Sequence, residues 1–480
     1  MKKLLILVHR YVGIAIALLM SAWCLSGLVM MYVGYPALDE QERIEGLPPL
    51  ELDDCCAYDA VLASAGEISL RSFAVEMLAG QPVLKLEADR GTYVVNLRNG
   101  ESVESVTQAQ ALQVAADYVE ARSLTGKPEL LDSIESDQWT VTGAYNAYRP
   151  MYRVALKDVL DTQLYIAGTN GEVVLDSTAR ERFWNWFGAV THWLYPSMLR
   201  QHAVVWSQVV VWTSLAGTFL TATGLWLGIV QIRAGLSRKF SPYSGWNWWH
   251  HVSGLLFGIL LLAWVASGLL SMNPWGLLEG TGARAEAERL RNFDLTSTEA
   301  VGALRAQIDS EVSAGAVRIS SAPFAGRLYL QLQAKDAVVR VDAETRVPSA
   351  LSEAELRRSS SQLQPGVPIL NAGLLTGGDA YYYDGRNGGR SYPVYRVILD
   401  DEERTRYYID PGTGSLLQKT DREGRWYRWL FQALHSWDFS AGLRERPLKD
   451  LLVLPLLLGV TGLSLSGVYL GFRRVKPKRQ

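Results

Sequence analysis

The sequence contains little cysteine and almost no net charge. Three cysteines occur in 480 residues, without a CxxC or CxxCH pattern, so covalent c-type haem, iron–sulfur clusters and cysteine-based zinc sites are not expected. Lys and Arg number 47 and Asp and Glu number 49, a net charge of −2, which offers no basic field for nucleic acid. Neither a P-loop nor an HExxH motif occurs, and no GxGxxG follows a strand pattern.

The three cysteines themselves predict little chemistry. Cys24 lies in an apolar stretch and is expected to be a small packed hydrophobic residue. Cys55 and Cys56 are adjacent. A disulfide between them is open in an oxidising compartment, but the sequence does not predict it.

Long apolar runs are prominent instead. Four uncharged stretches occur, at residues 11–34, 203–232, 252–278 and 451–472. Each exceeds the roughly 20 residues that a transmembrane helix needs. Many of the 16 Trp and 22 Tyr residues lie near the ends of these stretches, as interfacial anchors do. The sequence therefore predicts four membrane spans in a lipid bilayer and excludes a soluble cytosolic enzyme.

Basic residues orient these spans. They cluster at 2–10, 233–239 and 473–479, and short basic segments mark the cytoplasmic side of a membrane. Both termini are thus predicted to be cytoplasmic. The predicted order is a first span in 1–34, an outer domain at 35–182, an interfacial helix and second span at 183–232, a cytoplasmic loop at 233–249, a third span at 250–278, an outer domain at 279–425, and an interfacial helix, fourth span and basic tail at 426–480.

The two halves of the chain match each other. At a spacing of 243 residues His192 falls on His435, and at 241 residues His9 falls on His250. Further matches at these spacings are Arg182 with Arg425, Trp186 with Trp429, Gly224 with Gly467, Gly228 with Gly471 and Ser26 with Ser267. We therefore predict two tandem repeats, each made of span, outer domain, interfacial segment and span, in one orientation.

Patterns in the outer segments predict α+β domains. A capped amphipathic helix is expected to open at 105–111. The expected strands lie near 137–145, 150–157, 162–167, 393–399 and 406–409. The predicted fold class is a membrane protein with four transmembrane helices in two tandem repeats and two α+β extracytoplasmic domains.

All six histidines lie at or near the ends of the predicted spans, where titratable residues are functional candidates. On spans 1 and 3, a histidine shares one helical stripe with two glycines and a tryptophan. The two stripes are His9, Gly13, Trp23 and Gly27, and His250, Gly254, Trp264 and Gly268. Imidazole can ligate haem iron axially, and glycine lets a macrocycle or another helix come close.

A second matched pair lies at the other face. His192 and His435 each belong to an aromatic segment that is predicted to be an interfacial amphipathic helix before a span. A bilayer core is about 30 Å thick, so one haem does not bridge it, whereas two haems can relay electrons across it. We expect His9 to pair with His250 near the cytoplasm and His192 with His435 near the outer face.

Two histidines are alternatives to these four. His251 could replace His250 as the ligand or orient it, and His202 is a spare interfacial residue or an alternative outer ligand. The glycines of spans 2 and 4 are predicted to be helix-packing faces in preference to cofactor contacts. These glycines are Gly217, Gly224, Gly228, Gly459, Gly462, Gly467 and Gly471.

The chain resembles the PepSY-associated transmembrane family over essentially its whole length. The resemblance rests on His-Arg-Tyr-Val-Gly at 9–13, His-His-Val-Ser-Gly at 250–254, and the PepSY-like segments 152–172 and 395–414. It implies a bacterial inner-membrane protein of iron uptake with periplasmic PepSY-like domains. Some members are di-haem reductases that release iron from ferric siderophores in the periplasm. The ligands of two b-type haems implied by the resemblance are His9, His192, His250 and His435.

Other functions stay open. PepSY domains are also associated with peptidase inhibition, so the protein could be a non-enzymatic module that regulates a peptidase or another partner. It could also be an accessory subunit of siderophore transport. Some relatives carry a fused flavin reductase domain that this sequence lacks, so the expected electron donor is an unidentified partner on the cytoplasmic side.

Overall fold

The computed structural model describes residues 2–53, 55–235, 240–308, 315–335, 337–385 and 389–475. It divides into two compact units. The helical unit consists of Met1–Tyr35, Glu181–Gly280 and Arg422–Gln480, and the sheet unit consists of Pro36–Arg180 and Thr281–Asp421. Each unit is therefore assembled from both halves of the sequence.

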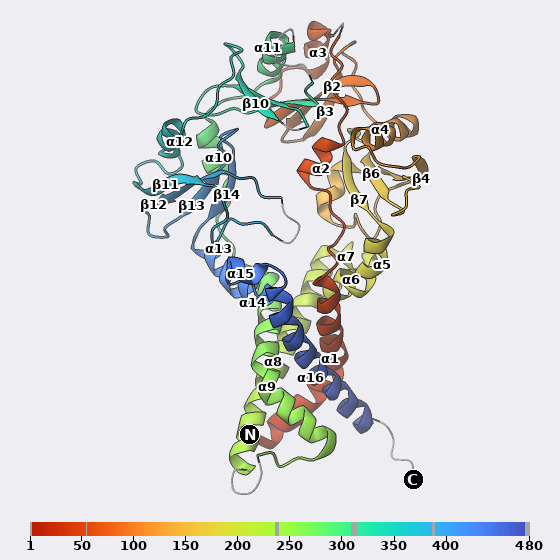
Figure 1. The fold of residues 1–480 in the computed structure, drawn as a ribbon, viewed down its shortest axis with the longest axis vertical. Helices are drawn as coiled ribbons and strands as arrows, with labels where there is room; N and C mark the ends of the chain where they lie inside the picture. The colour runs from red at the N-terminus through yellow and green to blue at the C-terminus, as the bar shows by residue number, and fades with distance from the viewer. Residues whose placement is uncertain are drawn as a thin grey trace. The chain divides into compact units, whose positions relative to one another are not determined.

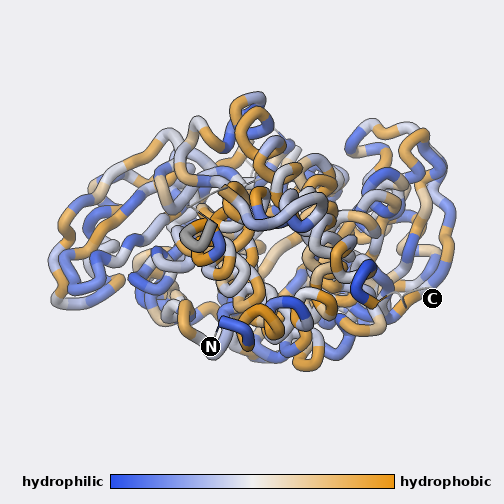
Figure 2. Tube along the Cα trace, turned by 90° about the horizontal axis from the view of Figure 1, so that it is seen from below, coloured by the Kyte–Doolittle hydropathy of each residue, from blue (hydrophilic) through white to orange (hydrophobic). Residues whose placement is uncertain are grey.

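The helical unit contains four long helices that lie side by side (Figure 1). They are α1 (Lys2–Met30), α8 (Ala203–Gly235), α9 (Gly245–Ser271) and α16 (Leu448–Val475). All four are long and apolar enough to cross a membrane, as predicted. Figure 2 colours the chain by hydropathy, with hydrophobic residues in orange. Helices α1 and α9 each pack against both α8 and α16.

An apolar cluster fills the interior of this bundle. It includes Ile16 and Met20 of α1, Leu261 of α9 and Val460 of α16. Cys24 belongs to the same cluster and is a buried free thiol, which confirms its prediction as a packed residue. Inside a bilayer these side chains stabilise the bundle through close van der Waals packing, because lipid tails are as apolar as the side chains themselves.

Short helices flank the four long ones. They are α5 (Ala179–Phe187), α6 (Ala189–His192), α7 (Ser197–Arg200), η2 (Pro274–Gly276), α13 (Arg422–Tyr427), the π-helical turn η4 (Arg428–Ala433), α14 (Leu434–Ser436) and α15 (Ala441–Arg444). The helix expected before span 2 is broken at Gly188, whose φ of −96° and ψ of −113° are not helical. A Cβ atom at Gly188 would lie 3.1 Å from the side chain of Val29. This break lets α6 pack against α1.

The sheet unit is built on one six-stranded antiparallel sheet in the order β10-β9-β8-β1-β2-β3. Its strands are β1 (Ser72–Leu78), β2 (Gln81–Ala88), β3 (Gly91–Asn96), β8 (Arg318–Ser321), β9 (Tyr329–Gln333) and β10 (Val338–Asp342). The two halves of the chain meet where β1 pairs with β8, with Val75 opposite Ile319. The two outer segments, predicted as separate domains, therefore share one sheet and one core.

Each outer segment also forms its own four-stranded antiparallel sheet. The first contains β4 (Glu129–Ile134), β5 (Met151–Ala155), β6 (Gln163–Ala167) and β7 (Val173–Ser177), and the second contains β11 (Ile369–Leu375), β12 (Val394–Leu399), β13 (Arg406–Ile409) and β14 (Leu416–Thr420). The helices of the unit among the described residues are α2 (Glu40–Glu45), α3 (Tyr58–Ala65), α4 (Gln108–Ala121), the 3-10 helix η1 (Gly143–Tyr148), α10 (Arg284–Arg291), α11 (Ser297–Ile308) and α12 (Glu353–Ser360). The α+β prediction is thus confirmed for this unit.

Local predictions in the sheet unit were mostly correct. Helix α4 is capped by Thr107 through a capping box with Gln110, as its sequence predicts. The strand expected near 137–145 was wrong. The Asp137 carboxylate there accepts hydrogen bonds from the backbone N–H groups of Trp139 and Thr140, so it holds a turn instead of a strand.

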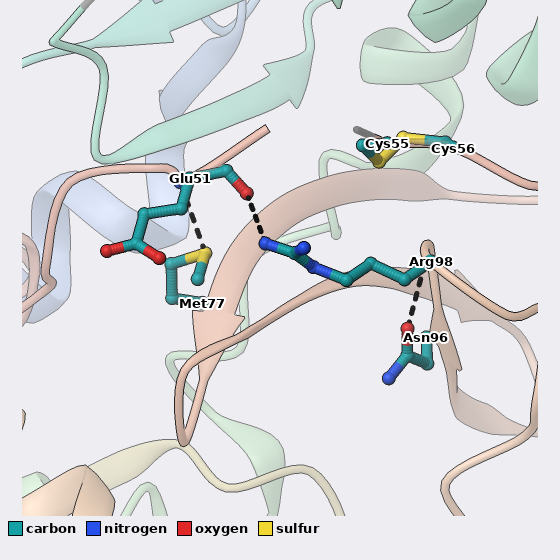
Figure 3. Close-up of a disulfide and its surroundings, with 6 residues drawn as sticks. All are labelled: Glu51, Cys55, Cys56, Met77, Asn96 and Arg98. Carbon is teal, nitrogen blue, oxygen red and sulfur yellow. Dashed lines mark hydrogen bonds between the residues drawn. A yellow bond between two sulfur atoms is a disulfide. The ribbon is translucent and has the colours of Figure 1, made fainter. Parts of the chain in front are cut away.

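Cys55 and Cys56 form a disulfide in the sheet unit (Figure 3). The sequence did not predict this bond. Both residues are half-buried and pack against the core that the six-stranded sheet covers. Just after the end of β3, the Arg98 guanidinium donates a hydrogen bond to the Glu51 carbonyl over 3.4 Å.

Candidate functional site

The helical unit brings four histidines together as two pairs. His9 of α1 and His250 of α9 have ring centroids 6.4 Å apart. His192 of α6 and His435 of α14 have ring centroids 5.9 Å apart. These are the two pairings that the sequence repeat suggested, and all four rings are half-buried.

His192 is anchored on α1. Its Nδ1 lies 3.0 Å from the Ser26 hydroxyl and 3.1 Å from the Trp23 carbonyl. The Ser26 hydroxyl donates its own hydrogen to the carbonyl of Ala22, at 2.7 Å. Because the Trp23 carbonyl can only accept, Nδ1 of His192 carries the proton, and the Ser26 hydroxyl oxygen accepts from it as well.

His435 is anchored on α9 in the same way. Its Nδ1 lies 3.1 Å from the Ser267 hydroxyl and 3.2 Å from the Trp264 carbonyl. The Ser267 hydroxyl donates to the Trp264 carbonyl over 3.0 Å. Nδ1 of His435 is therefore also a donor, and its Nε2 keeps a free lone pair.

The His9 and His250 pair uses α8 and α16 as its anchors. Nδ1 of His9 lies 3.1 Å from the Leu220 carbonyl and 3.5 Å from the Thr223 hydroxyl. Nδ1 of His250 lies 2.8 Å from the Ser466 hydroxyl. Each histidine thus uses Nδ1 to hold a neighbouring helix. In the described part of the chain, no hydrogen bond reaches Nε2 of any of the four.

A glycine lies against each of these imidazoles. The pairs and the distances from an ideal added Cβ to the nearest ring atom are Gly224 and His9 (2.5 Å), Gly467 and His250 (3.4 Å), Gly268 and His435 (3.4 Å), and Gly27 and His192 (3.8 Å). At Gly224 a methyl group would overlap the imidazole. Gly224 and Gly467 were predicted as helix-packing positions, and in the structure each lets a histidine of a neighbouring helix approach its own helix closely.

The other predicted lining residues lie elsewhere. Gly13 and Gly254 face Leu220 and Leu463, at 3.7 Å each from an added Cβ, so they serve helix packing. Trp23 and Trp264 contribute backbone carbonyls to the outer pair, and their half-buried indoles pack on the bundle core. The helical stripes therefore identified helices that carry the paired histidines, but they did not predict which atoms of these glycines and tryptophans contact the imidazoles.

His251 and His202 do not join the pairs. His251 is buried, and both its ring nitrogens are engaged: Nδ1 lies 2.8 Å from the Ser241 hydroxyl and Nε2 lies 3.0 Å from the Gly228 carbonyl. It therefore has no lone pair directed at His9. His202 is exposed at the start of α8, away from the described contacts of His192.

The donor set fits an axially ligated haem. A metal–imidazole bond is about 2 Å, so imidazoles on opposite sides of one metal ion have ring centroids about 6 Å apart. Both pairs match this spacing, and the hydrogen bonds at Nδ1 leave Nε2 as the nitrogen that could ligate a metal. Among the described residues, no cluster of three His, Cys, Asp or Glu ligand atoms includes any of the four histidines. A tetrahedral zinc site, which needs more protein ligands, is therefore disfavoured.

Comparison with known proteins adds no assignment. No protein-family model matches the chain, and no curated protein matches it.

Proposed function

We propose that this chain is a membrane-embedded cytochrome that binds two haems b and passes electrons from a cytoplasmic donor to a periplasmic ferric siderophore or chelate. The observation that carries the proposal is the pair of facing imidazole couples, His9 with His250 and His192 with His435. Both couples combine a free Nε2 with a hydrogen-bonded Nδ1.

The protein's part in this function is to hold, space and shield the two cofactors. His9 and His250 would ligate one haem, and His192 and His435 the other. Bound haem iron supplies one-electron exchange between its ferric and ferrous states. The helices supply rigid attachment, because each ligand imidazole is tied to a backbone or hydroxyl group of a different helix.

The spacing of the couples suits transfer across a bilayer. From His9 to Trp23, whose carbonyl holds His192, α1 rises about 21 Å at roughly 1.5 Å per residue. The apolar interior between them includes Met20, Leu261 and Val460. Such an interior excludes water and ions, so electrons can cross this region while protons and solutes cannot.

The proposed orientation of the protein in the membrane rests on the charged residues that flank the spans and on the disulfide. Lys2 and Lys3 begin α1, and Arg473 and Arg474 end α16, on the side of the His9 and His250 couple. Basic flanks favour the cytoplasm. The Cys55–Cys56 disulfide of the sheet unit supports an oxidising compartment, in agreement with a periplasmic sheet unit and a bacterial inner membrane.

The repeat and family assignments belong to the same proposal. Gly27 and Gly268, which lie against imidazoles, and the hydroxyls Ser26 and Ser267 recur at one spacing of 241 residues. This regularity supports two tandem repeats related by an approximate twofold axis. Membership of the PepSY-associated transmembrane family, and the ferric-siderophore reductase activity of some of its members, rest on the sequence resemblance of residues 9–13, 250–254, 152–172 and 395–414.

The first test is an absorption spectrum of the detergent-purified protein from haem-replete cells, oxidised and then reduced with dithionite. We expect a sharp reduced α-band and two b haems per chain. Adding ferric citrate to the reduced protein without oxygen should restore the oxidised spectrum and yield ferrous iron. A colourless protein would reject the cytochrome and favour a haem-free binding module. If the protein binds haem but ferric chelates do not oxidise the reduced haem, the proposed electron acceptor would be rejected and the cytochrome assignment would stand.

A further inference from the structure

A hydroxyl group accompanies every one of the four paired imidazoles. Ser26 and Ser267 face the outer couple at 3.0 and 3.1 Å. Thr223 and Ser466 face the inner couple at 3.5 and 2.8 Å. Neither composition nor the motif pattern assigned a role to these four side chains.

Each hydroxyl has already used its hydrogen. Ser466 donates to the Leu463 carbonyl over 2.6 Å, and Thr223 donates to the Phe219 carbonyl over 2.8 Å. Ser26 and Ser267 also donate within their own helices. The oxygen that faces the histidine can therefore only accept, so each imidazole is held as the Nδ1–H tautomer.

We infer that the hydroxyls of Ser26, Ser267, Thr223 and Ser466 belong to positioning residues that set the electron-donating strength of each paired histidine toward bound iron. For His192, His435 and His9 they act together with the backbone carbonyls that accept from the same Nδ1–H. The inference rests on the proposed function, because it concerns the ligands of the proposed haems. An acceptor on Nδ1–H increases the basicity of the ligating Nε2. A more basic ligand stabilises ferric iron over ferrous iron and lowers the midpoint potential of its centre.

The distances also predict a difference between the two centres. In the outer couple the two hydroxyls are equivalent. In the inner couple Ser466 lies at 2.8 Å, but Thr223 lies at the 3.5 Å limit of a hydrogen bond. The Ser466 hydroxyl should therefore contribute more to the inner centre than the Thr223 hydroxyl.

The test compares Ser267→Ala with Ser271→Ala in the purified holoprotein. Ser271 lies one helical turn further along α9 and donates to the Gly268 carbonyl over 2.7 Å, but it touches no histidine among the described contacts. A redox titration followed at the α-band gives the midpoint potentials of the two centres. A His435→Ala protein, which retains only the inner centre, assigns them.

We expect Ser267→Ala to raise the potential of the outer centre alone, with two haems retained. Ser271→Ala should leave both midpoint potentials unchanged. Ser267→Thr keeps a hydroxyl group, so the potential of its outer centre should stay at the lower wild-type value. On the inner centre, Ser466→Ala should shift the potential more than Thr223→Val. This second centre keeps the inference testable if Ser267→Ala does not fold.

Three results would overturn the inference while leaving the cytochrome intact. They are unchanged potentials in both Ser267→Ala and Ser466→Ala, an equal shift of both centres, and the same shift in Ser271→Ala. A wild-type protein without haem would instead reject the proposed function itself, so the two failures are distinguishable.

Discussion

His192 and His435 face each other with ring centroids 5.9 Å apart, yet each is held by a different membrane helix. The Trp23 carbonyl of α1 receives His192, and the Trp264 carbonyl of α9 receives His435. The couple therefore exists only when α1 and α9 pack in their native arrangement around α8 and α16. Cofactor binding should in turn stabilise this bundle by mass action.

Removing one outer ligand should remove one cofactor. Under the proposed function the outer couple of His435→Ala has lost one of its two ligand histidines, so haem content should fall from two to one per chain, and ferric-chelate reduction should fall by at least about 10–100-fold. The pyridine haemochrome assay counts the haem. His202→Ala is the matched control, because His202 is exposed, and it should keep both haems. Equal haem loss in the two variants would contradict the ligand assignment.

His250 and His251 should behave differently when each is replaced. His250→Ala should lose the inner haem. His251→Ala should keep both haems but destabilise the protein by about 1–3 kcal/mol, because Ser241 and the Gly228 carbonyl lose their hydrogen-bond partner. Haem counting together with thermal unfolding in detergent separates the two effects. Loss of a haem in His251→Ala alone would reverse the assignment.

Gly224→Ala should disturb the inner couple. The added methyl would lie 2.5 Å from Cε1 of His9, an overlap that costs about 1–3 kcal/mol when the surroundings must shift. We expect a changed or missing inner-centre spectrum and a lower unfolding temperature. Gly462→Ala is the control on another long helix, since no atom lies within 4 Å of its added Cβ. An unchanged spectrum in Gly224→Ala would show that His9 does not lie against Gly224 in the holoprotein.

Acid should weaken the sheet unit through Glu76. This buried carboxylate lies 2.7 Å from Lys85, 3.2 Å from Arg43 and 3.1 Å from Arg318. Burial alone raises the pKa of Glu76, but the three cations outweigh it and hold the pKa well below its usual range. The folded-state pKa is lower than the unfolded one, so the ion cluster contributes its full stability above about pH 4.3. That stability is lost as the pH falls further toward the folded-state pKa.

Urea unfolding from pH 7 to pH 3 measures this effect. Glu76→Gln should lower the free energy of unfolding at pH 7 by about 3–5 kcal/mol, because it leaves buried cations uncompensated, and it should flatten the acid dependence. Glu288→Gln removes an exposed ion pair with Arg284 and should change stability by less than about 1 kcal/mol. Identical acid profiles for wild type and Glu76→Gln would exclude Glu76 as the acid-sensitive group.

Several features followed from sequence alone, because they depend on local composition and periodicity. The four apolar runs exceed the length of a bilayer span, and all four are long apolar helices. Alternating apolar residues placed β5, β6, β12 and β13 correctly. The matched spacings of 241 and 243 residues predicted which histidines pair, and the two predicted pairs lie together in the helical unit.

Tertiary structure decided what those residues contact. Successive residues of a helix point about 100° apart, so only packing determines that His250 faces His9 while His251 turns to Ser241 and Gly228. The hydroxyl groups that lie beside the histidines can be identified only from the packed helices, because each hydroxyl belongs to a different helix from its histidine. The pairing of β1 with β8 likewise joins strands from opposite halves, and residues of both halves share the apolar core against this sheet. Local sequence therefore determined the elements, and long-range packing determined which side chains form the site.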